Sequence, residues 1–305
     1  MNEKSWTYRT VFQKPAVPAG SSVILAFDGL DTFAKVKLNG NVILESNNMF
    51  LAHRIDVTKA LGADGDHVLE IDFDCAMLRA RELRAKDPQH KWVGFNGDPA
   101  RMGVRKAQYH WGWDWGPVLM TAGIWRDVRL EVYTARVADL WTETDLAVDH
   151  HAAQISAFAQ VEGAISSSKV NFILSLHGQE VARAVAEPQD QVAKVAFDVQ
   201  QPSLWWPNGY GDPTLYEISA TLDQDGATVH QISKKIGIRT AEVVQRPDKH
   251  GKSFFFRING VDIFCGGSCW IPADNLLPSI SAERYRKWIE LMVHGRQVMI
   301  RYVLP

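Results

Sequence analysis

Between about residue 137 and residue 245 the chain alternates apolar and polar side chains in short segments. Turn signals such as His177-Gly178-Gln179 and Asp225-Gly226 separate these segments. A recurrence of about ten residues with turns between is typical of an all-β sandwich. The strands predicted on this basis are Gln154–Val161, Lys169–Leu176, Val192–Val199, Leu215–Leu222 and Thr228–Ile238.

The first 135 residues also predict strands. Val36, Leu38, Val42 and Leu44 alternate around Asn39-Gly40, the residue pair that favours a type I′ hairpin turn, and we expect all four on one face. Further strands are predicted at 23–27, 68–73 and 125–133, and a helix at 76–86. Residues 93–117 are rich in glycine and aromatics and predict a long functional connection without a regular element.

The last 60 residues no longer show the pattern of a β-sandwich. A hairpin is predicted from 254 to 264 around Asn259-Gly260. Ser281 can then cap a helix whose apolar stripe repeats at helical spacing, with Gly295 as the left-handed residue after its end. A strand over 298–303 follows, so the order is strand, helix, strand, as in a parallel β/α unit.

Composition excludes several classes of function. The formal net charge of −2 gives no reason to expect nucleic acid or an anionic membrane as a partner. No apolar run reaches the ~20 residues of a membrane span, and no secretory signal is visible. The three cysteines form neither a disulfide framework nor a zinc motif, and we expect Cys265 and Cys269 to be small buried side chains. Phosphate-binding and metal-ligating motifs are missing too, so no cofactor or metal is expected.

Five of the eleven tryptophans fall within residues 92–125, most densely in Trp111-Gly112-Trp113-Asp114-Trp115-Gly116-Pro117. In an extended backbone Trp111, Trp113 and Trp115 would lie on one side. Tryptophan suits the C–H faces of a sugar ring, and a neighbouring carboxylate can accept hydrogen bonds from two hydroxyls. The alternative is a tryptophan-rich core beneath a long loop. Trp270 and Asp274 follow a predicted strand of the β/α unit, where barrel enzymes place substrate-binding groups.

Six runs in order along the chain resemble glycoside hydrolase family 2, and within it the β-mannosidase branch. They are Ser5-Trp6-Thr7-Tyr8-Arg9, Phe27-Asp28-Gly29-Leu30-Asp31-Thr32, Trp111–Pro117, Trp205–Gly211, Gly237-Ile238-Arg239 and Trp270–Asp274. The resemblance implies a mostly β chain: a jelly-roll, galactose-binding-like domain over 1–135, an immunoglobulin-like sandwich over 136–245, and over 246–305 the first β/α unit of an incomplete (β/α)8 barrel.

The family's chemistry is retaining hydrolysis of terminal, non-reducing β-D-mannose by two glutamates about 5–5.5 Å apart. The only Asn-Glu pair, Asn2-Glu3, lies outside any barrel, and a whole barrel needs ~250 residues. We therefore expect both glutamates beyond the chain end, a truncation at both ends, and no activity of this chain alone. Carried over from the family, Trp113 and Asp114 would help line the mannosyl subsite. Trp115, from the same run, and Trp270 and Asp274, from their position after the strand, are further candidates for binding a β-mannoside oligosaccharide or an N-glycan core fragment. The alternatives are a mannoside-binding module without catalysis and a fragment without function.

Overall fold

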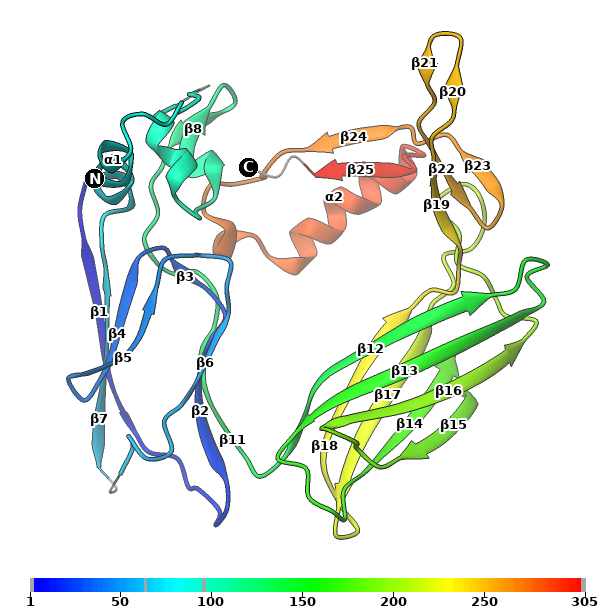
Figure 1. Ribbon diagram of the computed structural model, residues 1–305, viewed down its shortest axis with the longest axis horizontal. Coiled ribbons are helices and arrows are strands. Elements are labelled where there is room, and N and C mark those ends of the chain that lie inside the picture. The colour runs from blue at the N-terminus through cyan, green and yellow to red at the C-terminus, as the bar shows by residue number, and fades with distance from the viewer. Residues whose placement is uncertain (1–2, 63–64, 95–96, 303–305) are drawn as a thin grey trace. The chain divides into compact units, whose positions relative to one another are not determined.

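The computed structural model describes residues 3–62, 65–94 and 97–302, which form two compact units (Figure 1). The first unit holds the chain up to Tyr133 together with Trp270–Arg286. The second holds Thr134–Cys269 together with Lys287–Arg301. The domain boundaries predicted after residues 135 and 245 stay a proposal.

Two antiparallel sheets build the first unit. One has the order β1 (Trp6–Gln13), β7 (Asp66–Phe73), β4 (Ala34–Leu38), β5 (Asn41–Ser46), and the other β11 (Val128–Tyr133), β2 (Ser22–Phe27), β6 (His53–Asp56). Alternate residues of β7 are buried, as the sequence pattern predicts. They share one core with Val23, Leu25 and Phe27 of β2. Two short strands, β3 (Leu30–Asp31) and β10 (Gly123–Ile124), also pair.

The hairpin at Asn39-Gly40 forms as predicted, with φ angles of 51° and 82° at its two turn residues. The expectation that four apolar side chains share one face is wrong for Val42. A bulge shifts the register so that Val36 pairs with Leu44 but Lys37 pairs with Val42. One extra residue in a strand moves the following side chains to the other face. Val36 is therefore fully buried, whereas Val42 is 53% exposed.

Helix α1 (Ala76–Lys86) has the predicted bounds. The connection that follows is more regular than expected. It contains the 3-10 helices η1 (Pro99–Gly103) and η2 (Gln108–His110), and strands β8 (Trp111–Trp113) and β9 (Gly116–Val118) form a hairpin. The predicted strand over 125–133 begins only at Val128.

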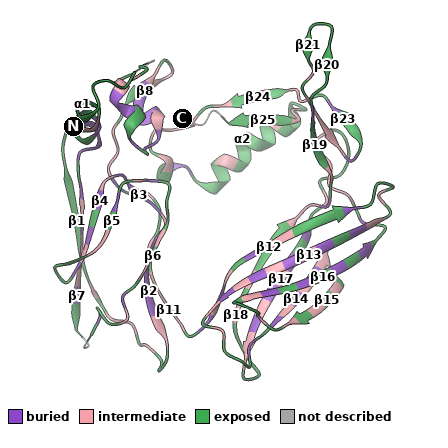
Figure 2. Ribbon diagram, viewed as in Figure 1, coloured by how far each residue is buried: buried purple, intermediate pink, exposed green. Residues whose placement is uncertain are grey.

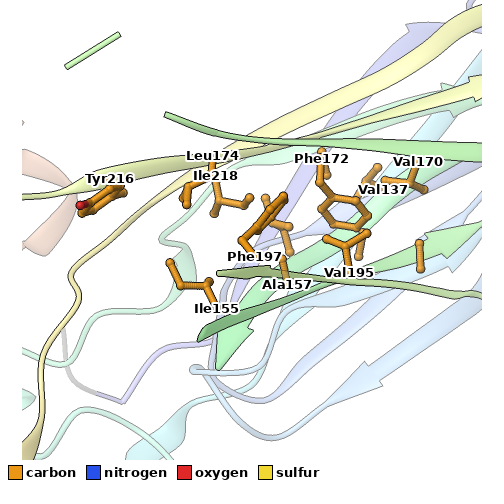
Figure 3. Packing of buried hydrophobic residues seen from close by; sticks show 14 of the residues in the cluster. Val137, Ile155, Ala157, Val170, Phe172, Leu174, Val195, Phe197, Tyr216 and Ile218 are labelled. Carbon is orange, nitrogen blue, oxygen red and sulfur yellow. The ribbon is translucent and has the colours of Figure 1, made fainter. Parts of the chain in front are cut away.

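The second unit is a β-sandwich with one core, and all the predicted strands between residues 154 and 238 form (Figure 2). Its two sheets have the orders β12-β13-β16 and β15-β14-β17-β18. Phe172, Leu174, Phe197 and Ile218 pack between them (Figure 3). The strands are β12 (Arg136–Leu146), β13 (Ala152–Glu162), β14 (Lys169–Leu176), β15 (Gln179–Ala186), β16 (Val192–Gln200), β17 (Tyr216–Gln224) and β18 (Ala227–Ile236).

Three small sheets follow the sandwich. β22 (Phe255–Ile258) lies between β19 (Ala241–Val244) and β23 (Val261–Ile263), and β20 (Pro247–Asp248) pairs with β21 (Gly251–Lys252). The predicted hairpin at Asn259-Gly260 is thus present. β24 (Gly267–Trp270) and β25 (Met299–Tyr302) are neighbours and point the same way in Figure 1, with α2 (Ala282–His294) between them in the chain.

Helix α2 begins as predicted, because the Ser281 hydroxyl accepts a hydrogen bond from the Arg284 backbone N–H. It does not end at a left-handed glycine. Arg296, with φ 55°, is the left-handed residue, and the Gln297 N–H bonds to the Met292 carbonyl in a Schellman arrangement. The last predicted strand residue, Val303, lies outside the described residues.

Cys265 and Cys269 are not buried as expected: the first is half-buried and the second exposed. Cys269 lies in β24, whose sheet among the described residues has only one other strand and so offers little cover.

No helix in the described ranges is long and apolar enough to cross a membrane.

Candidate functional site: the Trp-Asp-Trp hairpin

The Trp-Asp-Trp run forms the tip of the β8–β9 hairpin. Trp111 pairs with Val118 and Trp113 with Gly116, so Asp114 and Trp115 are the turn residues. Gly112 has a φ angle of 88°, and a Cβ there would come within 2.8 Å of a Val118 methyl group. Glycine at this position lets the two strands approach closely.

The three tryptophans do not lie on one side, because the extended backbone stops at Trp113. Trp111 is only 1% exposed and belongs to the same cluster as Met77 and Ala80 of α1. Trp115 packs against a different cluster. Trp113 lies beneath the Arg101 guanidinium, at 5.2 Å, and its ring is 6.4 Å from that of Trp115. The packing interpretation therefore holds for Trp111, whereas Trp113 and Trp115 frame the turn.

Asp114, which lies between Trp113 and Trp115 in the sequence, is exposed. Its carboxylate makes no hydrogen bond or ion pair with any residue that the structure describes. A carboxylate has about four acceptor positions. Asp114 therefore presents an unused set of hydrogen-bond acceptors to a ligand.

Asn275 holds the base of this hairpin. Its backbone carbonyl accepts a hydrogen bond from His110 Nε2, at 3.0 Å, just before β8. Its side-chain Nδ2 donates to the Pro117 carbonyl in β9, at 3.3 Å. Leu277, in the 3-10 helix η3 (Leu277–Ser279), packs against the cluster that Trp115 also contacts. The loop after β24 and the hairpin therefore form one local structure.

Trp270 is the last residue of β24 and does not follow the strand as predicted, whereas Asp274 lies on the loop after it. The Trp270 ring stacks on Tyr285 with centroids 6.1 Å apart. Asp274 is half-buried, and its Oδ1 accepts a hydrogen bond from the Leu276 N–H at 2.9 Å. Asp274 thus shapes the turn that leads to η3 and retains further acceptor capacity.

A buried polar network lies behind the hairpin, and sequence reasoning did not single it out. Lys106 Nζ lies 2.5 Å from Asp31 Oδ2, with side chains 0% and 2% exposed. The Thr121 hydroxyl donates to Asp31 and contacts His110 Nδ1 at 3.2 Å. Burial and then the Lys106 charge lower the pKa of His110 to about 4. His110 is therefore neutral near pH 7. Because its Nε2 faces a carbonyl, that nitrogen carries the proton.

Asp31 and His110 also line a pocket of about 420 Å³ in the first unit. Tyr8, Trp125 and Asn275 are among its other lining residues. None of the five side chains predicted to bind substrate lines it. Within the described ranges no three His, Cys, Asp or Glu side chains gather as metal ligands would.

Comparison with known families agrees with this architecture. Residues 1–126 match the family model described as glycosyl hydrolase 2 galactose-binding domain-like. Residues 135–239 match the one described as glycosyl hydrolases family 2. A galactose-binding-like domain followed by an immunoglobulin-like sandwich and a β/α unit is the domain order predicted from the sequence. The chain belongs to glycoside hydrolase family 2.

Its relatives narrow the similarity to one branch of the family. The chain is 76% identical to β-mannosidase B of Aspergillus flavus over 99% of its own length and 36% of that protein. It is 71% identical to β-mannosidase B of Aspergillus niger. A solved β-D-mannosidase structure from Dictyoglomus thermophilum superposes with a TM-score of 0.86 at 32% identity, over 98% of this chain and 37% of the other. The chain spans about a third of the length of these curated relatives.

Proposed function

We propose that the protein is a retaining glycosidase that releases terminal β-D-mannose, and that this chain supplies part of its mannosyl-binding site. The observation that carries the proposal is Asp114, an exposed carboxylate without a partner among the described residues, which lies at the hairpin tip next to Trp113 and Trp115 in the sequence. Such a carboxylate can accept from two hydroxyls of one sugar while an aromatic face covers its C–H surface.

The comparisons support the substrate class. The curated relatives are named β-mannosidase B, and the solved neighbour is a β-D-mannosidase. The substrate we propose is a β-mannoside oligosaccharide or an N-glycan core fragment. Trp113, Asp114, Trp115, Trp270 and Asp274 are the proposed binding residues. Because the chain spans about a third of its relatives, the activity is proposed for a protein of their length.

The test joins residues 1–305 to the remaining two thirds of the Aspergillus flavus relative. We expect this fusion to hydrolyse an aryl β-mannoside and the chain alone to show no turnover. Asp114→Asn in the fusion removes a charged acceptor, a loss of about 1.5–3 kcal/mol, and should lower kcat/KM by roughly 10- to 100-fold. Asp145→Asn, at an exposed carboxylate of the other unit, is the matched control. An inactive fusion with native-like unfolding, or an Asp114→Asn fusion with full activity, would contradict the proposal.

A second function, a binding module without catalysis, is favoured by the same exposed Asp114. It predicts that the chain alone binds mannobiose in calorimetry and that Asp114→Ala abolishes the heat of binding. Absence of binding to both forms counts against a module that works by itself.

A further inference from the structure

We infer that Asn275 and His110 are positioning residues of the mannosyl-binding site: they clamp the base of the β8–β9 hairpin and so fix where Asp114 presents its carboxylate. This inference rests on the proposed function, because it assigns to Asp114 the role of binding the sugar.

The clamp contacts both strands of the hairpin. The Asn275 carbonyl receives the His110 hydrogen bond at the start of β8, and the Asn275 side chain reaches the Pro117 carbonyl in β9. Asp114 lies between these two attachment points in the chain. Because both ends are tied to a single residue, the strands cannot shear past one another without breaking one of these bonds. The tip itself, including Asp114, stays exposed.

The clamp residue is itself held in place. Leu277 anchors the loop on the apolar side, in the cluster of Met49, Ala107 and Tyr109. On the polar side, the His110 ring is 2% exposed and contacts Thr121, which is tied to the Asp31–Lys106 ion pair. The buried His110 ring has little room to rotate, and its Nε2–H bond to the Asn275 carbonyl selects one orientation. A supporting shell of this kind is what keeps a binding group in its productive geometry.

A positioning role has its own kinetic consequence. When the clamp is broken, the hairpin populates arrangements in which Asp114 cannot reach the sugar. The apparent affinity for the sugar is then the intrinsic affinity multiplied by the fraction of molecules whose hairpin is still in the binding arrangement. Molecules that do bind the sugar react normally. Asn275→Ala should therefore raise KM about fivefold to tenfold and leave kcat nearly unchanged, as expected from losing about one net hydrogen bond.

The first experiment needs no activity. Hydrogen exchange is measured on the amides of residues 111–119 in the 305-residue chain. Asn275→Ala should speed their exchange, whereas Asn171→Ala should not. Asn171 is a matched control, because its amide donates one hydrogen bond to Asp223 in the other unit. Unchanged exchange in Asn275→Ala would overturn the clamp even if the mannosidase proposal holds.

The second experiment uses the fusion and an aryl β-mannoside. Asn275→Ala and Asp114→Asn are combined in a double-mutant cycle. If Asn275 acts through Asp114, the double variant should have the KM of Asp114→Asn alone. The positioning role would be overturned if the two substitutions raised KM independently, so that their effects multiplied in the double variant. A fall in kcat at constant KM in Asn275→Ala would overturn it too.

His110→Gln, whose amide can replace the Nε2–H donor, should keep the KM of the unchanged fusion, whereas His110→Leu should raise it. A fusion without activity refutes the proposed function, while hydrogen exchange still decides the clamp.

Discussion

Lys106 and Asp31 form an ion pair in the first unit with both side chains almost completely buried, and Lys106 Nζ lies within 2.7 Å of both carboxylate oxygens. Lys106 also donates to the carbonyl and hydroxyl of Thr121. Burial is the larger influence on Lys106 and lowers its pKa, although the neighbouring Asp31 charge opposes this effect. The pair is therefore electrostatically expensive to separate.

Removing one partner should be strongly destabilising. Lys106→Met leaves the Asp31 carboxylate buried and uncompensated, and we expect a loss of about 3–5 kcal/mol in the free energy of unfolding of the first unit. Lys35→Met, which breaks the exposed Lys35–Glu45 pair, should cost less than about 1 kcal/mol. Urea unfolding followed by tryptophan fluorescence measures both variants. Equal losses of unfolding free energy in the two variants would show that burial does not determine the cost of breaking an ion pair.

Stability should depend on pH through His110. Its pKa falls from 6.5 in the unfolded chain to about 4 in the folded one. The unfolded state then binds more protons between these values, so stability is fully present above pH 6.5 and declines as pH falls toward 4. The decline attributable to His110 is about 3 kcal/mol. His110→Gln should flatten this part of the curve of unfolding free energy against pH. If His110→Gln leaves the slope of unfolding free energy against pH unchanged, His110 is not the group responsible for it.

The sandwich core should respond to the loss of a large side chain. Phe172 is fully buried and packs among residues of both sheets (Figure 3). Phe172→Ala should destabilise the second unit by about 3–5 kcal/mol. Val181→Ala, at a side chain 43% exposed on β15, should change stability by less than about 1 kcal/mol. Hydrogen-exchange protection of β13 and β17 amides reports the effect on this unit alone.

Alanine substitutions at two glycines should distinguish the cost of backbone strain from the cost of a steric collision. Gly178 has a φ angle of 77°, and a Cβ there would meet nothing within 4 Å, so Gly178→Ala should cost only about 1–2 kcal/mol. Gly163 has a φ angle of 72°, but a Cβ there would be 2.2 Å from the Thr134 carbonyl oxygen. Gly163→Ala should therefore cost about 3 kcal/mol or more, since the backbone must move. Similar thermal unfolding of the two variants would contradict the predicted effect of the collision.

Local patterns predicted about half of the strands in the described residues, and two of the failures have a clear local cause. β12 was not predicted because a bulge between Val137 and Asp139 breaks its alternation, so Val137 and Leu140 are both buried although they are three positions apart. β15 was not predicted either, since it buries no side chain fully and starts with Gln179 and Glu180. A search for strict period-two alternation misses both kinds of strand.

The site was predictable only in part. The Trp-Asp-Trp run is continuous in the sequence, so its residue types could suggest a sugar-binding site, with a tryptophan-rich core as the alternative, and the family resemblance favoured the first. Asn275 gave no such signal, because its contact with Pro117 spans 158 positions in the chain. The ion pair of Lys106 with Asp31 spans 75. Contacts between residues this far apart depend on the tertiary fold.

The distance along the chain between Pro117 and Asn275 also sets an order of events during synthesis. Domains fold largely as they leave the ribosome, the N-terminal parts first. All seven strands of the sandwich lie between Arg136 and Ile236, so that domain can be complete before Asn275 has been translated. The hairpin tip must therefore wait, unclamped, while an entire intervening domain is made. The contact between Asn275 and Pro117 can therefore form only late in synthesis, after the segment that carries Asn275 has left the ribosome.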